Sequence, residues 1–177
     1  MSGSFFQQNV ENPVANVTRS ITAALITRHR ENLGSLRARG SDLDLLFILP
    51  HIQMRIGYEY VHSVVSSFSM NPILVGKKIP QVPGQTATFS GTFTARAWTL
   101  VALVRTAGRQ FDDDLNQFAL QPYSVTGVSI SKQIGRWTWF ASATNIFDAK
   151  IQVAATPVPN YALPRIISGG VRFAKAQ

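Results

Sequence analysis

The sequence predicts an all-β fold: an antiparallel transmembrane β-barrel wall of about eight strands, with short periplasmic turns alternating with long outer loops. Three observations predict it. Polar and apolar side chains alternate in many segments, connection lengths alternate, and aromatic residues gather at two levels. The clearest segment is 86–94, where a hydroxyl residue occupies every second position and Ala87, Phe89, Gly91 and Phe93 lie between. This alternation is typical of a strand with one polar and one apolar face.

Eight segments have the composition of strands. In chain order they lie near residues 4–13, 31–47, 51–65, 83–94, 97–107, 123–132, 137–147 and 164–173. In the second, Leu43 and Leu45 alternate with Asp42 and Asp44, and apolar residues at even positions of 52–60 mark the third. Carboxylates would be costly inside a small dry core, so the polar side of these strands is expected to be wet.

The fifth and eighth strands add detail. In the eighth, Ile167 and Val171 alternate with Ser168 and Arg172. The fifth, "WTLVALVR", is apolar on both faces. It either packs an inward patch, which includes Val101, against something inside a barrel, or is a buried strand of a soluble fold.

The connections alternate in length. Short ones fall near 48–50, 95–96 and 133–136, and long ones cover 14–30, 66–82, 108–122 and 148–163. Outer-membrane barrels have short periplasmic turns and long outer loops. Asn145 and Asp148 are expected to shape the exit from a strand into a loop, because Asn and Asp favour turns.

The aromatic residues indicate two membrane interfaces. Each tryptophan follows a short turn, whereas the tyrosines lie nearer the long loops. The expected lipid-facing and girdle residues are Trp98, Trp137, Trp139, Tyr58, Tyr60, Phe89, Phe93 and Phe173. Girdles of this kind flank the apolar band of membrane barrels. The alternative is that these rings form the core of a soluble β-sandwich.

Composition excludes several classes of function. Charged residues make up 15% of the 177 residues, below the roughly 25% of soluble domains, and the net charge is +8. The basic residues are scattered, which disfavours nucleic-acid binding, whereas contact with anionic lipid head groups is plausible. With no cysteine there is no disulfide or thiolate site. Neither a secretory signal nor an apolar run long enough for a spanning helix is evident.

No residue pattern predicts catalysis, a cofactor or a metal. The three histidines, His29, His51 and His62, are widely spaced, and no G-x-S-x-G elbow is present. We therefore expect a protein that is not an enzyme. The carboxylates of Asp42, Asp44 and Glu59 either act as an acid/base pair or line a wet lumen. In the second case they pair with arginines on neighbouring strands, for which the candidates are Arg37, Arg39 and Arg55.

One loop is a candidate for ligand contact. Its residues are Arg109, Asp112, Asp113, Asp114 and Asn116. Three consecutive carboxylates cannot all reach one ion from a strand, and no EF-hand spacing follows. The alternative is a polar loop whose carboxylates cap turns.

Six segments in series resemble a known family. They are "ENLGSLRARGSDLDL" (31–45), "GYEY" (57–60), "GKKIPQVP" (76–83), "GRQFDDDLN" (108–116), "NIFD" (145–148) and "YALPRIISGGVRF" (161–173). Together they span about residues 30–173, in order and spacing similar to the C-terminal part of the β-barrel of a TonB-dependent outer-membrane receptor. The motifs "GRQFDDD", "NIFD" and the terminal "PR…G…F" are the most specific.

The resemblance implies a single partial β-barrel domain over 1–177, an antiparallel transmembrane β-barrel segment without the plug domain. Family barrels have 22 strands and a plugged lumen. The usual final Phe is here followed by four residues, 174–177. The implied function is TonB-energised uptake, in the outer membrane of a Gram-negative cell, of a large scarce nutrient such as a siderophore, cobalamin or glycan. The implied partners are outer-membrane lipid, the rest of the barrel and plug, TonB through that plug, and the nutrient.

Two other interpretations stay open from the sequence. Eight strands can close into a complete small outer-membrane barrel with a filled interior. A soluble β-sandwich or a lipocalin-like binding protein would also use alternating strands. The loops at 66–82, 108–122 and 148–163 are the candidates for ligand contact if the resemblance holds.

Overall fold

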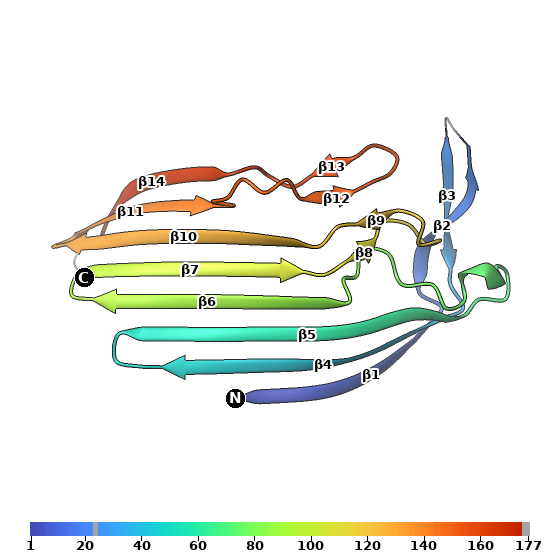
Figure 1. Ribbon diagram of the computed structural model, residues 1–177, viewed down its shortest axis with the longest axis horizontal. Coiled ribbons are helices and arrows are strands. Elements are labelled where there is room, and N and C mark those ends of the chain that lie inside the picture. The colour runs from blue at the N-terminus through green and yellow to red at the C-terminus, as the bar shows by residue number, and fades with distance from the viewer. Residues whose placement is uncertain (23–24, 175–177) are drawn as a thin grey trace.

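The computed structural model describes residues 1–22 and 25–174 and consists mainly of one antiparallel sheet (Figure 1). Its strands are β1 (Ser2–Glu11), β4 (Ser35–Ile48), β5 (Ile52–Ser67), β6 (Gln85–Ala95), β7 (Trp98–Ala107), β10 (Tyr123–Ile134), β11 (Trp137–Thr144) and β14 (Ile166–Phe173). They pair in the order β1-β4-β5-β6-β7-β10-β11-β14, so each strand pairs with the strand of this sheet that comes next along the chain. The all-β, eight-stranded prediction is confirmed. The sheet is open, with β1 and β14 at its edges.

The two ends of the sheet differ, as the gap lengths predict. Tight turns join β4 to β5, β6 to β7 and β10 to β11 at one end, on the left of Figure 1. Arg96 and Gly135 have positive φ angles of 54° and 60° in two of these turns, which lets two-residue hairpins match the twist of their strands.

The long connections at the other end contain small elements. These are β2 (Val14–Ile21), β3 (Ile26–Asn32), the 3-10 turn η1 (Pro72–Leu74), β8 (Gln110–Phe111), β9 (Ala119–Leu120), β12 (Gln152–Ala154) and β13 (Asn160–Tyr161). The gap at 14–30, expected to be a loop, is largely the β2–β3 hairpin. No helix in residues 1–22 and 25–174 is long and apolar enough to cross a membrane.

The strand registers assign every wall residue to one of two faces, because residues directly opposite each other in an antiparallel sheet share a face. Thr88 lies opposite Gly57 on β5 and Arg105 on β7. Phe89 lies opposite Ile56 and Val104. We call the first side the polar face and the second the apolar face.

Side chains on the polar face contact one another across strands. Arg55 on β5 pairs with Asp44 on β4, with an Nη2–Oδ2 distance of 2.8 Å. The Thr86 hydroxyl donates to Glu59 over 3.3 Å. The Ser4 hydroxyl likewise donates to Asp42, over 3.1 Å. The predicted ordering of this face by cross-strand contacts is therefore seen for Arg55.

For Arg37 and Arg39 the predicted pairing with these carboxylates is wrong. Arg39 lies opposite His62, and Arg37 opposite Val64. Both arginines are at odd positions of β4, and the two-residue period of a strand places them on the face opposite Asp42.

The doubly apolar strand β7 contributes to both faces. Leu103 lies on the polar face between Ser90 and Gly127 and is 50% exposed. Val101 is on the same face, between Thr92 and Ser129. The inward apolar patch expected from the sequence is thus present, and nothing within the described residues covers it.

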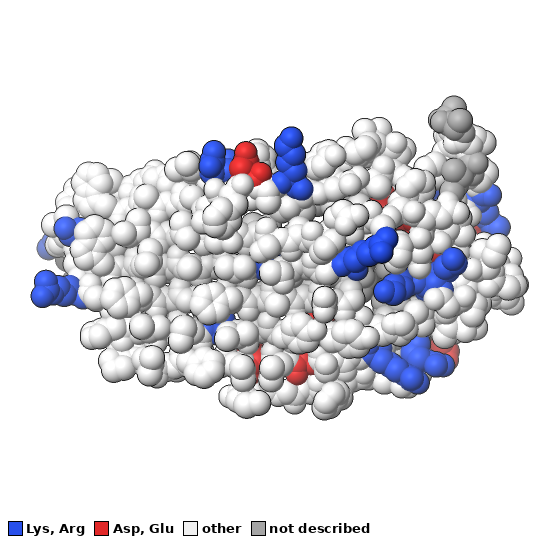
Figure 2. All heavy atoms as spheres, viewed as in Figure 1, with Lys and Arg blue, Asp and Glu red and all other residues white. Residues whose placement is uncertain are grey.

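Aromatic side chains lie at the short-turn end of the apolar face. The Trp137 and Phe173 rings, on paired positions of β11 and β14, have centroids 4.8 Å apart. The Lys132 ammonium lies 4.8 Å from the centroid of Trp98, a cation–π contact. In Figure 2 the centre of this face shows few charged atoms, basic side chains stand at both ends of its long axis, and a mixed group of basic and acidic side chains lies at its upper edge.

The main hydrophobic cluster lies beside the loops. Val17, Leu33, Val65, Phe68 and Leu74 form it, each at most 5% exposed. The wall itself is a single layer whose large apolar residues stay exposed. A β-sandwich buries such residues between two sheets, so this arrangement does not favour the sandwich interpretation.

Candidate functional site in the loop layer

The four long connections at the end opposite the tight turns form what we call the loop layer. Its described residues are 12–22, 25–34, 68–84, 108–122 and 145–165. Figure 1 places them together on the right, around β8 and β9. The segment 112–116 joins them to one another through its side chains.

Asp113 organises its own loop. Its carboxylate accepts hydrogen bonds from the backbone N–H groups of Gln117, over 3.0 Å, and Phe118, over 2.7 Å. The side chain is almost fully buried, at 2% exposure. Asp113 therefore closes the turn between β8 and β9, as the capping interpretation expects.

Asp112 reaches the loop that follows β11. One oxygen, Oδ2, accepts from the Thr156 N–H and hydroxyl, over 2.8 and 2.7 Å, and from the Ala155 N–H over 3.1 Å. Its other oxygen accepts from the Gln81 amide over 3.2 Å. Burial alone would raise the pKa of Asp112, but hydrogen bonds from Thr156, Gln81 and Ala155 stabilise the carboxylate and hold that pKa below its ordinary value.

Asp114 connects the β2–β3 hairpin. It accepts from the backbone N–H of Thr18 over 2.8 Å and from the Thr18 hydroxyl over 2.5 Å. On β3, Arg28 donates to the Thr156 hydroxyl over 2.7 Å. Thr156 therefore joins this hairpin to Asp112, since its hydroxyl accepts from Arg28 and donates to the carboxylate.

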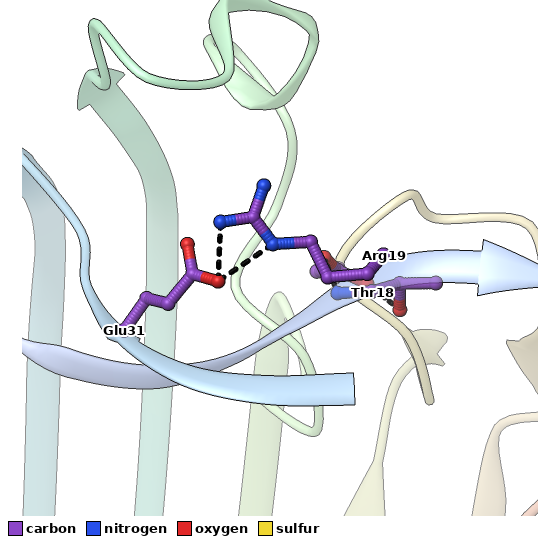
Figure 3. A network of polar contacts seen from close by, with 4 residues as sticks. Thr18, Arg19 and Glu31 are labelled. Atoms are coloured by element: carbon purple, nitrogen blue, oxygen red, sulfur yellow. Dashed lines mark hydrogen bonds and ion pairs between the residues drawn. The ribbon is translucent and has the colours of Figure 1, made fainter. Parts of the chain in front are cut away.

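A second polar contact holds the hairpin itself. The Arg19 guanidinium on β2 reaches the Glu31 carboxylate on β3, with an Nε–Oε1 distance of 2.7 Å (Figure 3). The register shifts between Thr18 and Ser20, which marks an irregularity at Arg19. The side chain of Arg19 stays 46% exposed, so the pair stabilises the hairpin only modestly.

Asn116 fixes the loop that follows β5. Its amide group donates to the Lys78 carbonyl over 2.9 Å, and its carbonyl oxygen accepts from the Lys78 N–H over 2.7 Å. Asn116 has a φ of 59°, a conformation that Asn tolerates better than most residues. We call Asp112, Asp113, Asp114 and Asn116 the loop clamp.

A cavity of about 300 Å³ lies between the clamp and the hydrophobic cluster. Its polar lining includes the three aspartates, Arg28, Lys78 and Gln81, and its apolar lining includes Val17, Leu33, Val65 and Leu74. It carries charge of both signs but no group suited to nucleophilic or acid/base chemistry beyond the clamp carboxylates, whose oxygens already accept hydrogen bonds. Across residues 1–22 and 25–174, no cluster of His, Asp and Glu could hold a metal ion.

Comparison with known proteins identifies the family. The model of the TonB dependent receptor-like β-barrel matches residues 1–146, most of the chain. The chain belongs to the TonB-dependent receptor β-barrel family. The comparison with curated proteins found no match.

Solved receptors share the fold of this receptor wall. The siderophore receptor PiuA from Acinetobacter baumannii is 18% identical with a TM-score of 0.77; the alignment covers 97% of this chain and 25% of PiuA. The ferric yersiniabactin uptake receptor FyuA from Yersinia pestis is 16% identical with a TM-score of 0.72, over 97% of this chain and 34% of FyuA. The ferric-catecholate import receptor Fiu from E. coli K12 is 16% identical with a TM-score of 0.72, over 96% and 24%. The chain thus spans a quarter to a third of these receptors.

The five predicted ligand-contact residues of the receptor wall have different surroundings. The polar side-chain atoms of the four clamp residues form hydrogen bonds with other residues of the chain. Arg109 remains exposed, with its guanidinium 5.8 Å from the centroid of Phe111. Ligand contact stays a prediction for this loop, and Arg109 is its most accessible member.

Sequence reasoning missed the residues that the clamp holds. Thr18 and Thr156 lie in segments far from the clamp in the chain, and no local motif marks them. Gln81 lies within the quoted segment 76–83, but nothing in that segment indicates its contact with Asp112. The predicted turn role of Asn145 and Asp148 is confirmed. Asn145 exchanges hydrogen bonds with the backbone of Ala149, and Asp148 accepts from the Arg165 N–H over 2.9 Å.

Proposed function

We propose that this chain is part of the wall of an outer-membrane receptor, with its apolar face against lipid and its polar face toward the lumen. Ala95 pairs with Trp98, and Gln85, at the other end of β6, pairs with Tyr60. The ten or so residues between these levels span about 33 Å at about 3.3 Å each. With a strand tilt of about 40°, that length crosses about 25 Å, the height of the apolar band in such barrels. This match between aromatic levels and band height carries the proposal.

Nitroxide labels on single-cysteine variants at each position of 86–93 test which face meets lipid. The labels are placed in the complete receptor, and since this chain itself has no cysteine, only cysteines elsewhere in the receptor need to be replaced. In lipid vesicles, labels at Ala87, Phe89, Gly91 and Phe93 should collide more with oxygen, which concentrates in the bilayer. Labels at the intervening positions should collide more with a water-soluble nickel complex. A trace without a two-residue period would overturn the assignment.

We further propose that the complete receptor imports a ferric siderophore, energised through TonB, with the loop layer contributing to ligand contact. PiuA, FyuA and Fiu are described as siderophore, ferric yersiniabactin and ferric-catecholate receptors, which supports this ligand class above cobalamin or a glycan. The exposed Arg109 suits an anionic ligand. The plug and the other barrel strands complete the transporter, and this wall contributes no covalent chemistry.

Uptake in cells tests the transport proposal. Iron-starved cells whose only outer-membrane siderophore receptor is the one containing this chain would be given ⁵⁵Fe-loaded catecholate, hydroxamate and carboxylate siderophores in turn. At least one should be taken up, and collapse of the inner-membrane proton gradient should stop uptake. Arg109→Ala should raise the concentration for half-maximal uptake, whereas Lys150→Ala, an exposed residue of another loop, should not. No uptake of any of the three would contradict the ligand class.

A further inference from the structure

A group of basic side chains occupies the loop-side end of the apolar face. Arg39 lies opposite His62 on β5, and Arg37 lies opposite Val64, which itself forms an isolated bridge with Lys78. Arg37, Arg39, His62 and Lys78 are therefore neighbours on one face, and all four are exposed. We call them the basic belt.

The belt has little opposing charge around it. The two ion pairs within residues 1–22 and 25–174 are Arg19 with Glu31 and Arg55 with Asp44, so no belt residue takes part in one. On β1 the positions opposite Arg39 and Arg37 are Gln7 and Asn9, both neutral. Glu11 is the one carboxylate of β1 on this face, one row farther toward the loops. Three permanent positive charges thus face a single negative one.

The position of the belt along the strands indicates which part of the membrane lies beside it. Tyr58 and Tyr60 lie on the same face, and His62 follows Tyr60 by two residues on β5, about 7 Å along the strand. Tyrosines anchor at the level of lipid head groups. The belt therefore begins where the apolar band ends, on the outer side, at the depth of the head-group phosphates.

We propose that the basic belt binds the phosphate groups of outer-leaflet lipid at this edge of the wall. The inference rests on the proposed contact of the apolar face with lipid and adds a specific polar contact to it. Arg37 and Arg39 are about 7 Å apart along β4, so each can bind a separate phosphate group. Guanidinium groups bind phosphate through two parallel hydrogen bonds, and the charged head group gains from three nearby positive charges.

The complete receptor, purified in a neutral detergent, provides the test. Binding of short-chain phosphatidic acid, a phosphomonoester lipid, and of phosphatidylcholine with the same acyl chains would be measured by native mass spectrometry. The wild type should prefer phosphatidic acid. The double variant R37Q/R39Q should bind phosphatidic acid about 30-fold more weakly, because each basic residue contributes about 1 kcal/mol. Raised salt should weaken binding by the wild type more than binding by the variant.

Two further variants make the result specific. R30Q/K150Q removes the same charge from exposed residues of the loop layer and should leave phosphatidic acid binding unchanged. R37K/R39K keeps the charge and should retain most of the binding. Equal loss in R37Q/R39Q and R30Q/K150Q would overturn the proposal, as would equal affinity for the two lipids. Full competition by millimolar inorganic phosphate would instead show a site for free phosphate.

Failure of this proposal is distinguishable from failure of the membrane assignment. Label accessibility along 86–93 reports the lipid contact of the apolar face without involving any belt residue. A two-residue period there, combined with no lipid preference in the binding experiment, would remove the belt proposal alone. Heat-modifiable gel migration of each variant checks that its barrel is folded before binding is compared.

Discussion

The wall and the loop layer of this receptor segment are stabilised in different ways. In the wall each strand is joined to its neighbours by long ladders of backbone pairs. In the loop layer a few side chains join segments far apart in the chain: Asp114 binds Thr18 across 96 positions, and Asp112 binds Thr156 across 44. The wall therefore depends on a pattern, and the loop layer depends on individual residues.

The largest effect is expected from a charged residue placed on the apolar face of the wall, which tests whether the wall depends on its two-residue pattern. Val104 lies near the middle of the band, between Phe89 and Thr126. Val104→Arg should destabilise the barrel by about 2–4 kcal/mol, the cost of a basic side chain at the bilayer midplane. Urea unfolding in lipid vesicles, followed by tryptophan fluorescence, measures the loss.

The matched control is on the other face. Thr92 lies between Gln53 and Val101, without a charged residue directly opposite. Thr92→Arg should change the free energy of unfolding by less than about 1 kcal/mol, because a lumen-facing guanidinium stays hydrated. Comparable destabilisation by both substitutions would mean that the two faces are not distinct environments.

In the loop layer one substitution should loosen two loops at once. Asp112→Ala removes the acceptor for the N–H groups of Ala155 and Thr156 and for the Gln81 side chain. We expect local stability to fall by about 1–3 kcal/mol, because buried donors lose their partner. Hydrogen exchange at 155–156 should speed up accordingly, while exchange in β6 stays unchanged.

Glu11→Gln is the comparison for Asp112→Ala. It also removes a carboxylate, but one that is exposed on β1. Its exchange profile should match that of the wild type. If β6 exchanged faster in Asp112→Ala, the loop layer and the wall would form one cooperative unit, and the contrast between them would fail.

The same contrast explains what the sequence could predict. Alternation in 86–94 and in 52–60 repeats the two-residue period many times, so the strands, their order and the tight turns could be found without a structure. The clamp could not be found in full. Asp113 caps its own turn, a local contact that composition predicts, but the partners of Asp112 and Asp114 are brought near by the fold alone.

The error over Arg37 and Arg39 has a physical cause that the sequence did contain. Charge complementarity with Asp42 and Asp44 favoured pairing, but strand parity places odd and even positions of β4 on opposite faces. Following the period through all of β4 would have placed these arginines beside the tyrosine level. An apparently suitable partner is thus weaker information than the period of the strand.

A smaller effect is expected when the loop clamp is titrated. The pKa of Asp112 is lower in the folded protein than in the unfolded chain. Its stabilising contribution is therefore complete above about pH 4, the ordinary range of an Asp carboxyl, and is lost as the pH falls through the folded-state value. The change should be smaller than that of Asp112→Ala, because a protonated carboxyl still accepts one or two of the hydrogen bonds.

Exchange-competent opening at 155–156, measured between pH 6 and 2.5 and corrected for the intrinsic pH dependence of exchange, reads out this titration. Asp112→Asn supplies the comparison, since its amide does not titrate in this range. Opening that rises equally with acid in both proteins would assign the pH response to other groups. Opening that rises only in the wild type would assign it to Asp112.

The smallest effect concerns the ion pair between Arg55 and Asp44 on the polar face of the wall. Arg55 and Asp44 are 65% and 37% exposed, so water screens their attraction. Arg55→Gln should cost only about 0.2–1 kcal/mol of unfolding free energy, and added salt should narrow the difference from the wild type. A double-mutant cycle with Asp44→Asn isolates the pair. A coupling well above 1 kcal/mol would mean that this region of the lumen excludes water, and the wall would then depend on an individual side-chain pair as the loop layer does.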